Sequence, residues 1–187
     1  MAKQPIHSLD VLRQLLAYDP ETGKIWWIER KPCHFAPTRQ SPEWRAHFWN
    51  SKYASAEAFI GRNGNGYLVG RIDGQKYYAH RVIWALHNGR WPAHGIDHIN
   101  GVRDDNRIVN LREATAAENS RNARRPTNNT SGVKGVSLFK ATGRWEAYIS
   151  AGGSKKKHLG FYATRDEAAD AYAQAARQFY GDFARLA

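Results

Sequence analysis

The spacing of hydrophobic residues in the first part of the chain predicts short helices and strands. After Ser8, a favourable helix N-cap, leucines recur on one side of a helix predicted over residues 9–18. Proline and glycine mark a turn at 19–24, and the apolar residues 25–28 predict a strand after it. Residues 31–60 are rich in aromatic residues and proline but lack a clear periodicity, so no element is predicted there.

A hairpin and a helix are predicted next. Strands at 67–72 and 76–79 flank an Asp-Gly pair at 73–74, and this dipeptide is common in two-residue hairpin turns. A helix follows over residues 79–87, with its apolar residues on one face, and Gly89 ends it.

The last part of the chain predicts a compact unit of three strands and one helix. The strands fall at 133–138, 144–150 and 156–161, separated by glycine-containing turns. A capping-box pattern at 164–167 begins a helix rich in alanine, and Gly181 ends it.

Period-two alternation assigns the side chains of these strands to two faces. The apolar alternate residues of the second strand are expected to face the helix, together with Leu159 and Phe161 of the third strand. The inward set is Trp145, Ala147, Ile149, Lys157, Leu159 and Phe161, and the outward set includes Arg144, Tyr148, Lys156 and His158.

The amino-acid composition indicates a protein with a substantial hydrophobic core and a strongly positive net charge. Of the 187 residues, 42% are hydrophobic, and 28 Lys and Arg against 17 Asp and Glu give a formal net charge of +11. Such an excess favours nucleic acid as the partner, because phosphates are the polyanion that a cationic surface most often meets. The alternative is a basic protein whose charge serves only solubility.

The sequence also argues against several other classes of protein. Cys33 is the only cysteine, which excludes an intramolecular disulfide and a cysteine-rich zinc cluster. The first ten residues lack the apolar run of a signal peptide, and no window approaches the roughly 20 apolar residues that cross a bilayer. We therefore expect an intracellular, soluble protein with no membrane partner.

Residues 96–122 carry the candidate chemistry. Asp97 and His98 are adjacent on a predicted strand, a polar loop follows, and residues 107–111 predict a short returning strand. The capping-box pattern at 115–118 begins a helix that presents Asn119 in its first turns. Phosphodiester hydrolysis needs a base such as histidine and a hard cation, which carboxylate and amide oxygens can bind.

The stretch "DHINGVRDDNRIVNLREATAAENSRN" resembles the ββα-metal core of phage-type HNH endonucleases, which include homing endonucleases. The resemblance covers roughly residues 60–125 and implies that His98 is the general base. It also implies that Asp97 and Asn119 bind one Mg²⁺ or Mn²⁺ in the active site, and that Asn110 ties the loop and orients the histidine ring. Asparagine rather than histidine at 119 favours an oxygen-preferring cation over zinc.

Four neighbouring residues keep two interpretations each. His80 either supports packing or touches phosphate, and Asp105 is either a loop residue or a further member of the metal shell. Arg107 and Arg121 are either surface charges or phosphate contacts.

Residues 131–185 resemble the AP2/ERF DNA-binding domain through G-V-x-G-V, W-x-A-x-I, L-G-x-F and an alanine-rich helix. That resemblance implies that the outer face of the sheet lies in the major groove. Ser137 and His158 depart from the residues of the plant members, so the target sequence does not follow from the resemblance. The residues expected to contact DNA are Arg121, Arg124, Arg125, Lys134, Lys140, Arg144, Tyr148, Lys156 and His158.

Together the patterns and resemblances predict an α+β protein in four parts. Residues 1–60 form an N-terminal helix, strand and aromatic segment, and 61–125 form the HNH nuclease domain. A basic, polar linker at 126–131 precedes the AP2-like domain at 132–187.

The predicted function is a metal-dependent endonuclease that cuts double-stranded DNA and is targeted by the C-terminal module. A single site cuts one strand, so we expect a monomer that nicks; the resemblance also suggests a phage or prophage protein acting in the cytoplasm of a bacterial host. The alternatives are a catalytically inactive DNA-binding or regulatory protein and an enzyme that acts on RNA.

Overall fold

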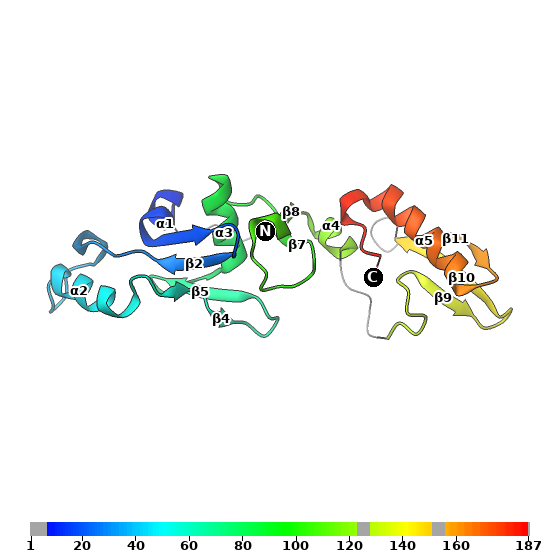
Figure 1. The fold of residues 1–187 in the computed structure, drawn as a ribbon, viewed down its shortest axis with the longest axis horizontal. Helices are drawn as coiled ribbons and strands as arrows, with labels where there is room; N and C mark the ends of the chain where they lie inside the picture. Colours follow the sequence, from blue (N-terminus) through cyan, green and yellow to red (C-terminus); the bar gives the residue numbers. More distant parts are fainter. Residues whose placement is uncertain (1–6, 123–127, 151–155, 187) are drawn as a thin grey trace. The chain divides into compact units, whose positions relative to one another are not determined.

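The computed structural model describes residues 7–122, 128–150 and 156–186. The chain divides into two compact units, Met1–Glu113 and Ala114–Ala187, and each is described by itself (Figure 1). Both units combine helices with small sheets, which confirms the predicted α+β class. The division falls within the predicted nuclease domain, 61–125, and assigns Asn119 to the second unit.

The first unit begins with α1 (Leu9–Leu15), whose N-cap Ser8 accepts a hydrogen bond from a backbone N–H of the first turn. The prediction of a helix through residue 18 is wrong, because the chain becomes extended at Leu16 and forms β1 (Leu16–Asp19). This strand pairs antiparallel with β2 (Lys24–Trp27). Pairing satisfies the backbone while keeping Leu16 buried, so burial of that leucine does not require a helix.

Within 31–60 the structure contains elements that the sequence pattern did not reveal. A 3-10 turn, η1 (Pro32–His34), is followed by α2 (Pro42–Tyr53) and the short strand β3 (Glu57–Ala58), which pairs with β2. Helix α2 has a good start signal in Ser41, yet Ala46 is its only buried residue. Without a buried stripe the helix has no apolar periodicity to recognise.

The next segment confirms the predicted hairpin and helix. Strands β4 (Gly61–Arg62), β5 (Leu68–Ile72) and β6 (Gln75–Tyr78) form an antiparallel sheet in that order. Helix α3 (Ala79–Asn88) ends at Gly89, which has a left-handed backbone conformation with φ +66°.

The Asp-His pair lies at the end of β7 (Gly95–His98). The predicted returning strand, 107–111, is wrong over most of its length: the chain first forms the 3-10 turn η2 (Ile108–Asn110), closed by a hydrogen bond from the Asn110 N–H to the Arg107 carbonyl, 2.9 Å. Strand β8 (Leu111–Ala114) begins only after this turn and pairs with β7.

One hydrophobic core supports the candidate site of the first unit. Its buried residues come from α1, the strands β1, β2, β3, β5 and β6, helix α3, and the strands β7 and β8. The largest members are Leu12, Leu15, Leu16, Ile25, Phe59, Ile72, Tyr77, Val82, Ile83, Ile96 and Leu111. Because β7 and α3 share this core, the two histidines that they carry, His98 and His80, are held on a rigid scaffold.

The second unit begins with the last residue of β8 and with α4 (Ala116–Arg121), whose capping box confirms the predicted helix start. Strands β9 (Val136–Phe139), β10 (Arg144–Ser150) and β11 (Lys156–Tyr162) form an antiparallel sheet with β10 in the centre. Helix α5 (Arg165–Tyr180) packs on one face of this sheet, and the 3-10 turn η3 (Gly181–Phe183) follows it (Figure 1).

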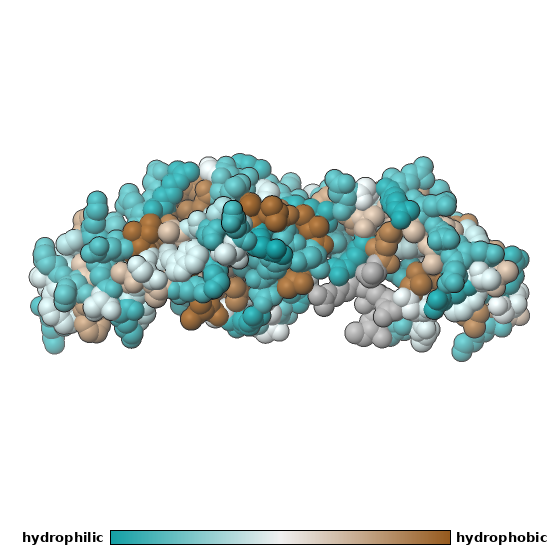
Figure 2. Space-filling model, viewed as in Figure 1, coloured by the Kyte–Doolittle hydropathy of each residue, from teal (hydrophilic) through white to brown (hydrophobic). Residues whose placement is uncertain are grey.

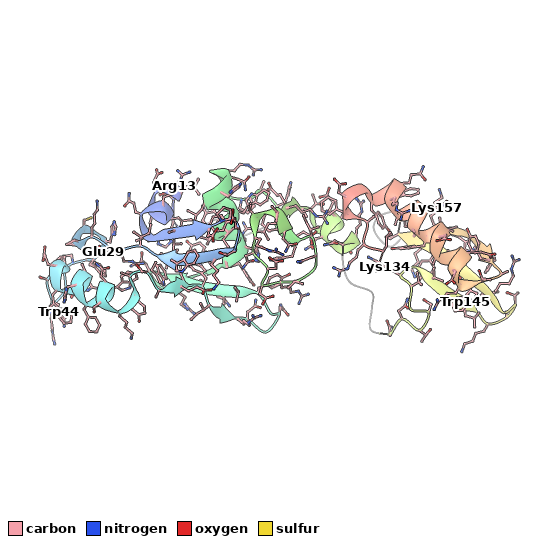
Figure 3. The ribbon with its side chains drawn as sticks, in the orientation of Figure 1. Arg13, Glu29, Trp44, Lys134, Trp145 and Lys157 are labelled. Atoms are coloured by element: carbon pink, nitrogen blue, oxygen red, sulfur yellow. The ribbon has the colours of Figure 1, made fainter. Side chains whose placement is uncertain are left out.

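The helix-facing side of the sheet follows the predicted alternation on β10 but not along the whole of β11. Ala147 and Ile149 are fully buried, and Trp145 packs against the same core (Figure 3). Strand β11 contains a bulge: the pairing register shifts between Ala147 and Tyr148, so Leu159 is an extra residue. Beyond it Phe161 pairs with Glu146 and is 40% exposed, so its predicted inward position is wrong.

Two features of the surface complete the description. Figure 2 shows a mainly hydrophilic face over both units, in keeping with the charge of the chain. Among the residues that the structure describes, no helix is both long and apolar enough to cross a membrane.

Candidate active site

His98 is a buried histidine in a polar surrounding. It is 4% exposed, and its Nε2 lies 3.0 Å from the side-chain oxygen of Asn106, which is itself 1% exposed. An amide oxygen can only accept, so this bond places the proton on Nε2 and the lone pair on Nδ1. Burial lowers the pKa of His98, while the bond to Asn106 and the charge of Asp97 oppose that shift. The imidazole is therefore neutral at pH 7, the form that a general base requires.

Asn110 holds the polar loop that follows His98. Its side-chain oxygen accepts from the Asn100 N–H at 3.0 Å, and its amide group donates to the Asp105 carbonyl at 2.7 Å. The backbone adds a third bond, from the Ile99 N–H to the Asn110 carbonyl at 2.9 Å. Asn110 is 6% exposed, so these bonds are largely shielded from water. The loop that carries Asn106, the partner of His98, is fixed by this arrangement.

One charge pair and one amide hydrogen bond inside the loop stabilise the same conformation. Arg107 donates to both carboxylate oxygens of Asp105, from Nε at 2.8 Å and from Nη2 at 2.6 Å, and the side chain of Asn100 donates to it at 2.7 Å. The hydrogen bond from Arg107 is the main reason why the pKa of Asp105 falls to about 2. Asp105 and Arg107 thus form a loop-stabilising pair.

The turn between β1 and β2 packs against the backbone of the loop that follows His98. The Ile108 N–H donates to the Pro20 carbonyl at 3.3 Å. Gly23, with φ +71°, lies so close that a Cβ atom there would meet the Arg107 N and Asn106 C atoms at 2.4 Å. Only glycine fits at this position, because both the backbone conformation and the contact exclude a side chain.

Asp97 is buried beside an arginine that the sequence analysis did not single out. The carboxylate is 5% exposed, and its Oδ2 accepts from Arg112 Nε at 2.9 Å and Nη2 at 2.8 Å. Because Arg112 is on β8, which pairs with β7, alternation along both strands is the signal that could have found it. Arg112 and Asp97 therefore form an ion pair that lies at the candidate site.

A cluster of rings surrounds His98. The ring of His80 lies edge-on at 5.1 Å between centroids, and Tyr67 lies at 5.7 Å from His98 and 5.2 Å from His80. Burial, and then the neighbouring His98 and Arg81, lower the pKa of His80 to about 3. Its Nδ1 is buried without a hydrogen-bond partner in the described part of the chain. His80 is therefore a neutral, tightly packed neighbour of the candidate base.

Asn119 and the arginines that follow it belong to the second unit or lie outside the described residues. Asn119 is in α4, with its N–H bonded to the Thr115 carbonyl at 2.9 Å, and its approach to Asp97 stays a prediction. The guanidinium of Arg121 lies 5.3 Å from the centre of the Tyr180 ring. Arg124 and Arg125 lie outside the residues that the structure describes.

The predicted DNA-contacting residues of the sheet share its outer face. Tyr148 and His158 are directly paired across β10 and β11, and Lys156 Nζ lies 4.3 Å from the centre of the Tyr148 ring. The bulge adds Phe161 to this face, where its ring lies 4.8 Å from that of His158 and 5.2 Å from that of Phe139. Arg144 is exposed at the start of β10. We call the nine residues Ser137, Phe139, Arg144, Glu146, Tyr148, Ser150, Lys156, His158 and Phe161 the outer sheet face.

The remaining two predicted contacts, Lys134 and Lys140, lie in loops. Lys134 is half-buried, and its ammonium donates to the Arg121 carbonyl at 2.7 Å, so it caps the end of α4 (Figure 3). Burial lowers the pKa of Lys134. Lys140 is exposed in the turn between β9 and β10.

Comparison of the sequence with known proteins shows the family to which the chain belongs. Residues 77–121 match the model of the HNH endonuclease family. Over 110 residues the chain is 37% identical to protein 3.8 of Escherichia phage T7, an alignment that covers 57% of this chain and 88% of the phage protein. The chain belongs to the protein 3.8 family. No solved structure matches it.

The HNH match of this protein 3.8 family member contains every residue that was predicted to act in catalysis or to bind the metal. Asp97, His98, Asn110 and Asn119 all fall within 77–121, as do His80 and Arg112. The match ends before the C-terminal sheet, and nothing in the comparisons supports the AP2/ERF resemblance of residues 131–185. The HNH domain indicates a DNA endonuclease.

Sequence reasoning missed Asn106, Arg112 and Tyr67. Asn106 is the most deeply buried polar residue among those the structure describes. An asparagine eight residues after the histidine carries no general signal, because loop length alone does not say which side chain turns inward. Among the described residues, no group of three or more His, Cys, Asp and Glu side chains could hold a metal ion.

Proposed function

We propose that this protein is a divalent-metal-dependent endonuclease that hydrolyses phosphodiester bonds in duplex DNA and cuts one strand per event. The observation that carries the proposal is the environment of His98, a neutral buried imidazole whose Nε2 is fixed by Asn106 within the HNH-matching segment. The similarity to a phage T7 protein supports a phage or prophage origin and action inside the bacterial host.

His98 performs the proton transfer. With Nε2 bonded to Asn106, the lone pair of Nδ1 accepts a proton from water as that water attacks phosphorus, and the new imidazolium keeps its Nε2 bond. Asp97, the preceding residue, favours the imidazolium that forms, because its negative charge raises the pKa of His98 against the effect of burial. Asn110 is a positioning residue, since it acts only by holding the loop.

The donor chemistry of the site suits a hard cation. Asp97 would supply a carboxylate oxygen and Asn119 an amide oxygen, so these two residues would hold one Mg²⁺ or Mn²⁺. Two ligands from the protein are enough for Mg²⁺, because this ion usually keeps several waters or phosphate oxygens in its coordination shell. When bound, such an ion neutralises charge on the phosphate and on the departing 3′ oxygen.

We further propose that the outer sheet face binds duplex DNA, as the AP2/ERF resemblance suggests. Arg144 and Lys156 supply positive charge for phosphates, and Tyr148 and His158 supply groups that can hydrogen-bond to base edges. Lys134 contributes less in this proposal, because its ammonium already bonds to the Arg121 carbonyl.

The test is cleavage of supercoiled plasmid by the full chain with Mg²⁺ and with EDTA. Wild type should convert the plasmid to the nicked form only with the metal, and His98→Ala should cut about 10²–10⁴-fold more slowly while binding DNA as before. His87→Ala, which changes an exposed histidine on α3, is the control and should cut like wild type. Equal cutting by His98→Ala and wild type would refute the assigned role.

One observation favours a second candidate, a DNA-binding protein without nuclease activity. The carboxylate of Asp97 already has a guanidinium partner in Arg112, so its charge is balanced without a cation. In that case wild type would bind duplex DNA but leave the plasmid intact with either Mg²⁺ or Mn²⁺. The plasmid assay therefore separates the two candidates.

A further inference from the structure

A cavity of about 720 Å³ lies in the first unit, among η1, α2, the end of β2 and the β5–β6 hairpin. Its volume is within the range of small-molecule binding sites, roughly 300–1,000 Å³. None of its lining residues belongs to the candidate active site. The lining consists of Trp27, Arg30, His34, Phe35, Ala36, Arg45, Trp49, Tyr53, Arg71 and Asp73.

Flat side chains dominate this cavity. The guanidinium of Arg30, which is 7% exposed, lies 4.5 Å from the centre of the Trp49 ring and 5.4 Å from that of Trp27. The two indoles meet edge to face at 5.5 Å, and Tyr53 lies 5.3 Å from Trp49. Aromatic rings and guanidinium planes are the surfaces on which unpaired nucleic-acid bases stack.

The cavity also carries an excess of positive charge. Its lining has three arginines against one aspartate, and Asp73 is paired with Arg30 at 3.1 Å. Arg45 and Arg71 donate to the backbone carbonyls of Ala36 and Gly74, and in the described part of the chain neither forms an ion pair with a carboxylate. Two guanidinium groups are thus available for an anion at the same cavity.

Two buried nitrogen atoms of the lining lack a hydrogen-bond partner within the described residues. These atoms are Arg30 Nε and His34 Nδ1. Buried polar atoms are almost always bonded to protein or water, so each such atom calls for an explanation. A ligand with hydrogen-bonding groups around a flat ring would satisfy them.

We propose that this cavity binds an unpaired nucleotide, with the base stacked among Trp27, Trp49 and Arg30 and the phosphate held by Arg45 and Arg71. The shared chemistry is that of a nucleoside monophosphate, either free or as one unit of a single strand. A base within a duplex is stacked on both faces and cannot enter. The proposal goes beyond the nuclease function and does not depend on cleavage.

Binding is measured with the full chain carrying His98→Ala, in EDTA, so that the result is independent of nuclease activity. Fluorescence anisotropy compares a labelled single-stranded oligonucleotide with the matching duplex, and dAMP serves as the competitor. Trp49→Ala and Arg45→Gln should each weaken single-strand binding, Trp49→Ala by about 5- to 150-fold, which corresponds to the loss of one stacked base. The matched controls Trp44→Ala, an exposed position on the same helix, and Arg13→Gln should bind like the parent (Figure 3).

The variants and the competitor together decide the outcome. Competition by dAMP supports a pocket for the free nucleotide, and single-strand binding that dAMP does not displace supports a nucleotide within a strand, provided that both cavity variants lose it. Parent-like single-strand binding by Arg45→Gln and Trp49→Ala overturns the proposal. Arg45 is only half-buried, so its variant keeps the test valid if Trp49→Ala does not fold. Failure here leaves plasmid nicking unaffected, which separates it from failure of the nuclease proposal.

Discussion

Gly23 offers the sharpest test of how the candidate active site is held in place. It lies in the β1–β2 turn, far in sequence from His98, yet its Cα faces the backbone of Asn106 and Arg107. Replacing it by alanine adds a methyl group at 2.4 Å from two backbone atoms of that loop, whereas tight contacts of real Cβ atoms begin above 3.0 Å and ordinary ones at 3.4 Å. The change introduces no charge and removes no hydrogen bond, so its effect reports on space and conformation alone.

The expected magnitude has two parts. Alanine in a left-handed conformation costs about 1–2 kcal/mol relative to glycine, and forcing apart a packed contact costs about 1–3 kcal/mol more. To reach 3.4 Å from 2.4 Å, the Asn106–Arg107 backbone must retreat by about 1 Å, a displacement that at a catalytic group can lower the rate by about 10²-fold. We expect Gly23→Ala to lose about 2–5 kcal/mol of unfolding free energy and most of its nicking activity.

Gly74→Ala is the matched control, because Gly74 is in the same unit, has φ +80° and would place its Cβ in open space. It should lose only the conformational part, about 1–2 kcal/mol, and keep wild-type activity. Urea denaturation of both variants and plasmid nicking at a temperature where both are folded provide the comparison. Equal losses of stability together with equal nicking would show that the turn does not support the loop.

The remaining predictions concern the loop and the second unit. Asn110→Ala removes two shielded hydrogen bonds and should lower the unfolding free energy by about 2–4 kcal/mol in denaturation, whereas the 78% exposed neighbour Val109→Ala should change it by less than about 0.5 kcal/mol. Asp105 has a folded-state pKa of about 2, below its ordinary 3.8, because Arg107 bonds to it. Its contribution is therefore present above pH 4 and lost as the pH falls toward 2. Since solvent screens the pair, Asp105→Asn should cost only about 1 kcal/mol at pH 7 and flatten stability between pH 4 and 2; an unchanged acid profile would contradict this. Thr164→Ala removes the N-cap of α5 and should lower the melting temperature of the second unit by an amount equivalent to about 1 kcal/mol; an unchanged melting temperature would argue against the cap.

Local sequence signals accounted for much of the fold where a cap, a turn or a buried stripe was present. Ser8 and Thr164 both cap the helices that they predicted, and the Asp-Gly pair at 73–74 forms its hairpin turn. Helix α2 was not predicted from the sequence, because its aromatic residues line a cavity or face solvent and do not pack in a core. The spacing of hydrophobic residues reflects which side chains are buried, so a helix with few buried residues lacks a recognisable hydrophobic periodicity.

Contacts between residues that are far apart in the sequence explain which parts of the candidate site could not be predicted. Alternation along β7 and β8 could identify Arg112 as the partner of Asp97 only once the register of the two strands is known, and that register depends on the 3-10 turn at residues 108–110. Likewise, Asn106 turns toward His98 only because Asn110 and the turn around Gly23 fix the loop. The roles of Asp97, Asn110 and Asn119 came from the family resemblance, and they stay predictions until the variants are measured.

Because β11 contains one extra residue, the number of residues in this strand determines which of its side chains lie on the outer sheet face. Deleting Leu159 would remove the bulge but leave Lys156, His158 and Phe161 on one face, because the register already pairs His158 with Tyr148 and Phe161 with Glu146 on either side of it. One residue inserted into β11 without a second bulge would instead turn the residues on one side of the insertion to the opposite face of the sheet, which a substitution cannot do.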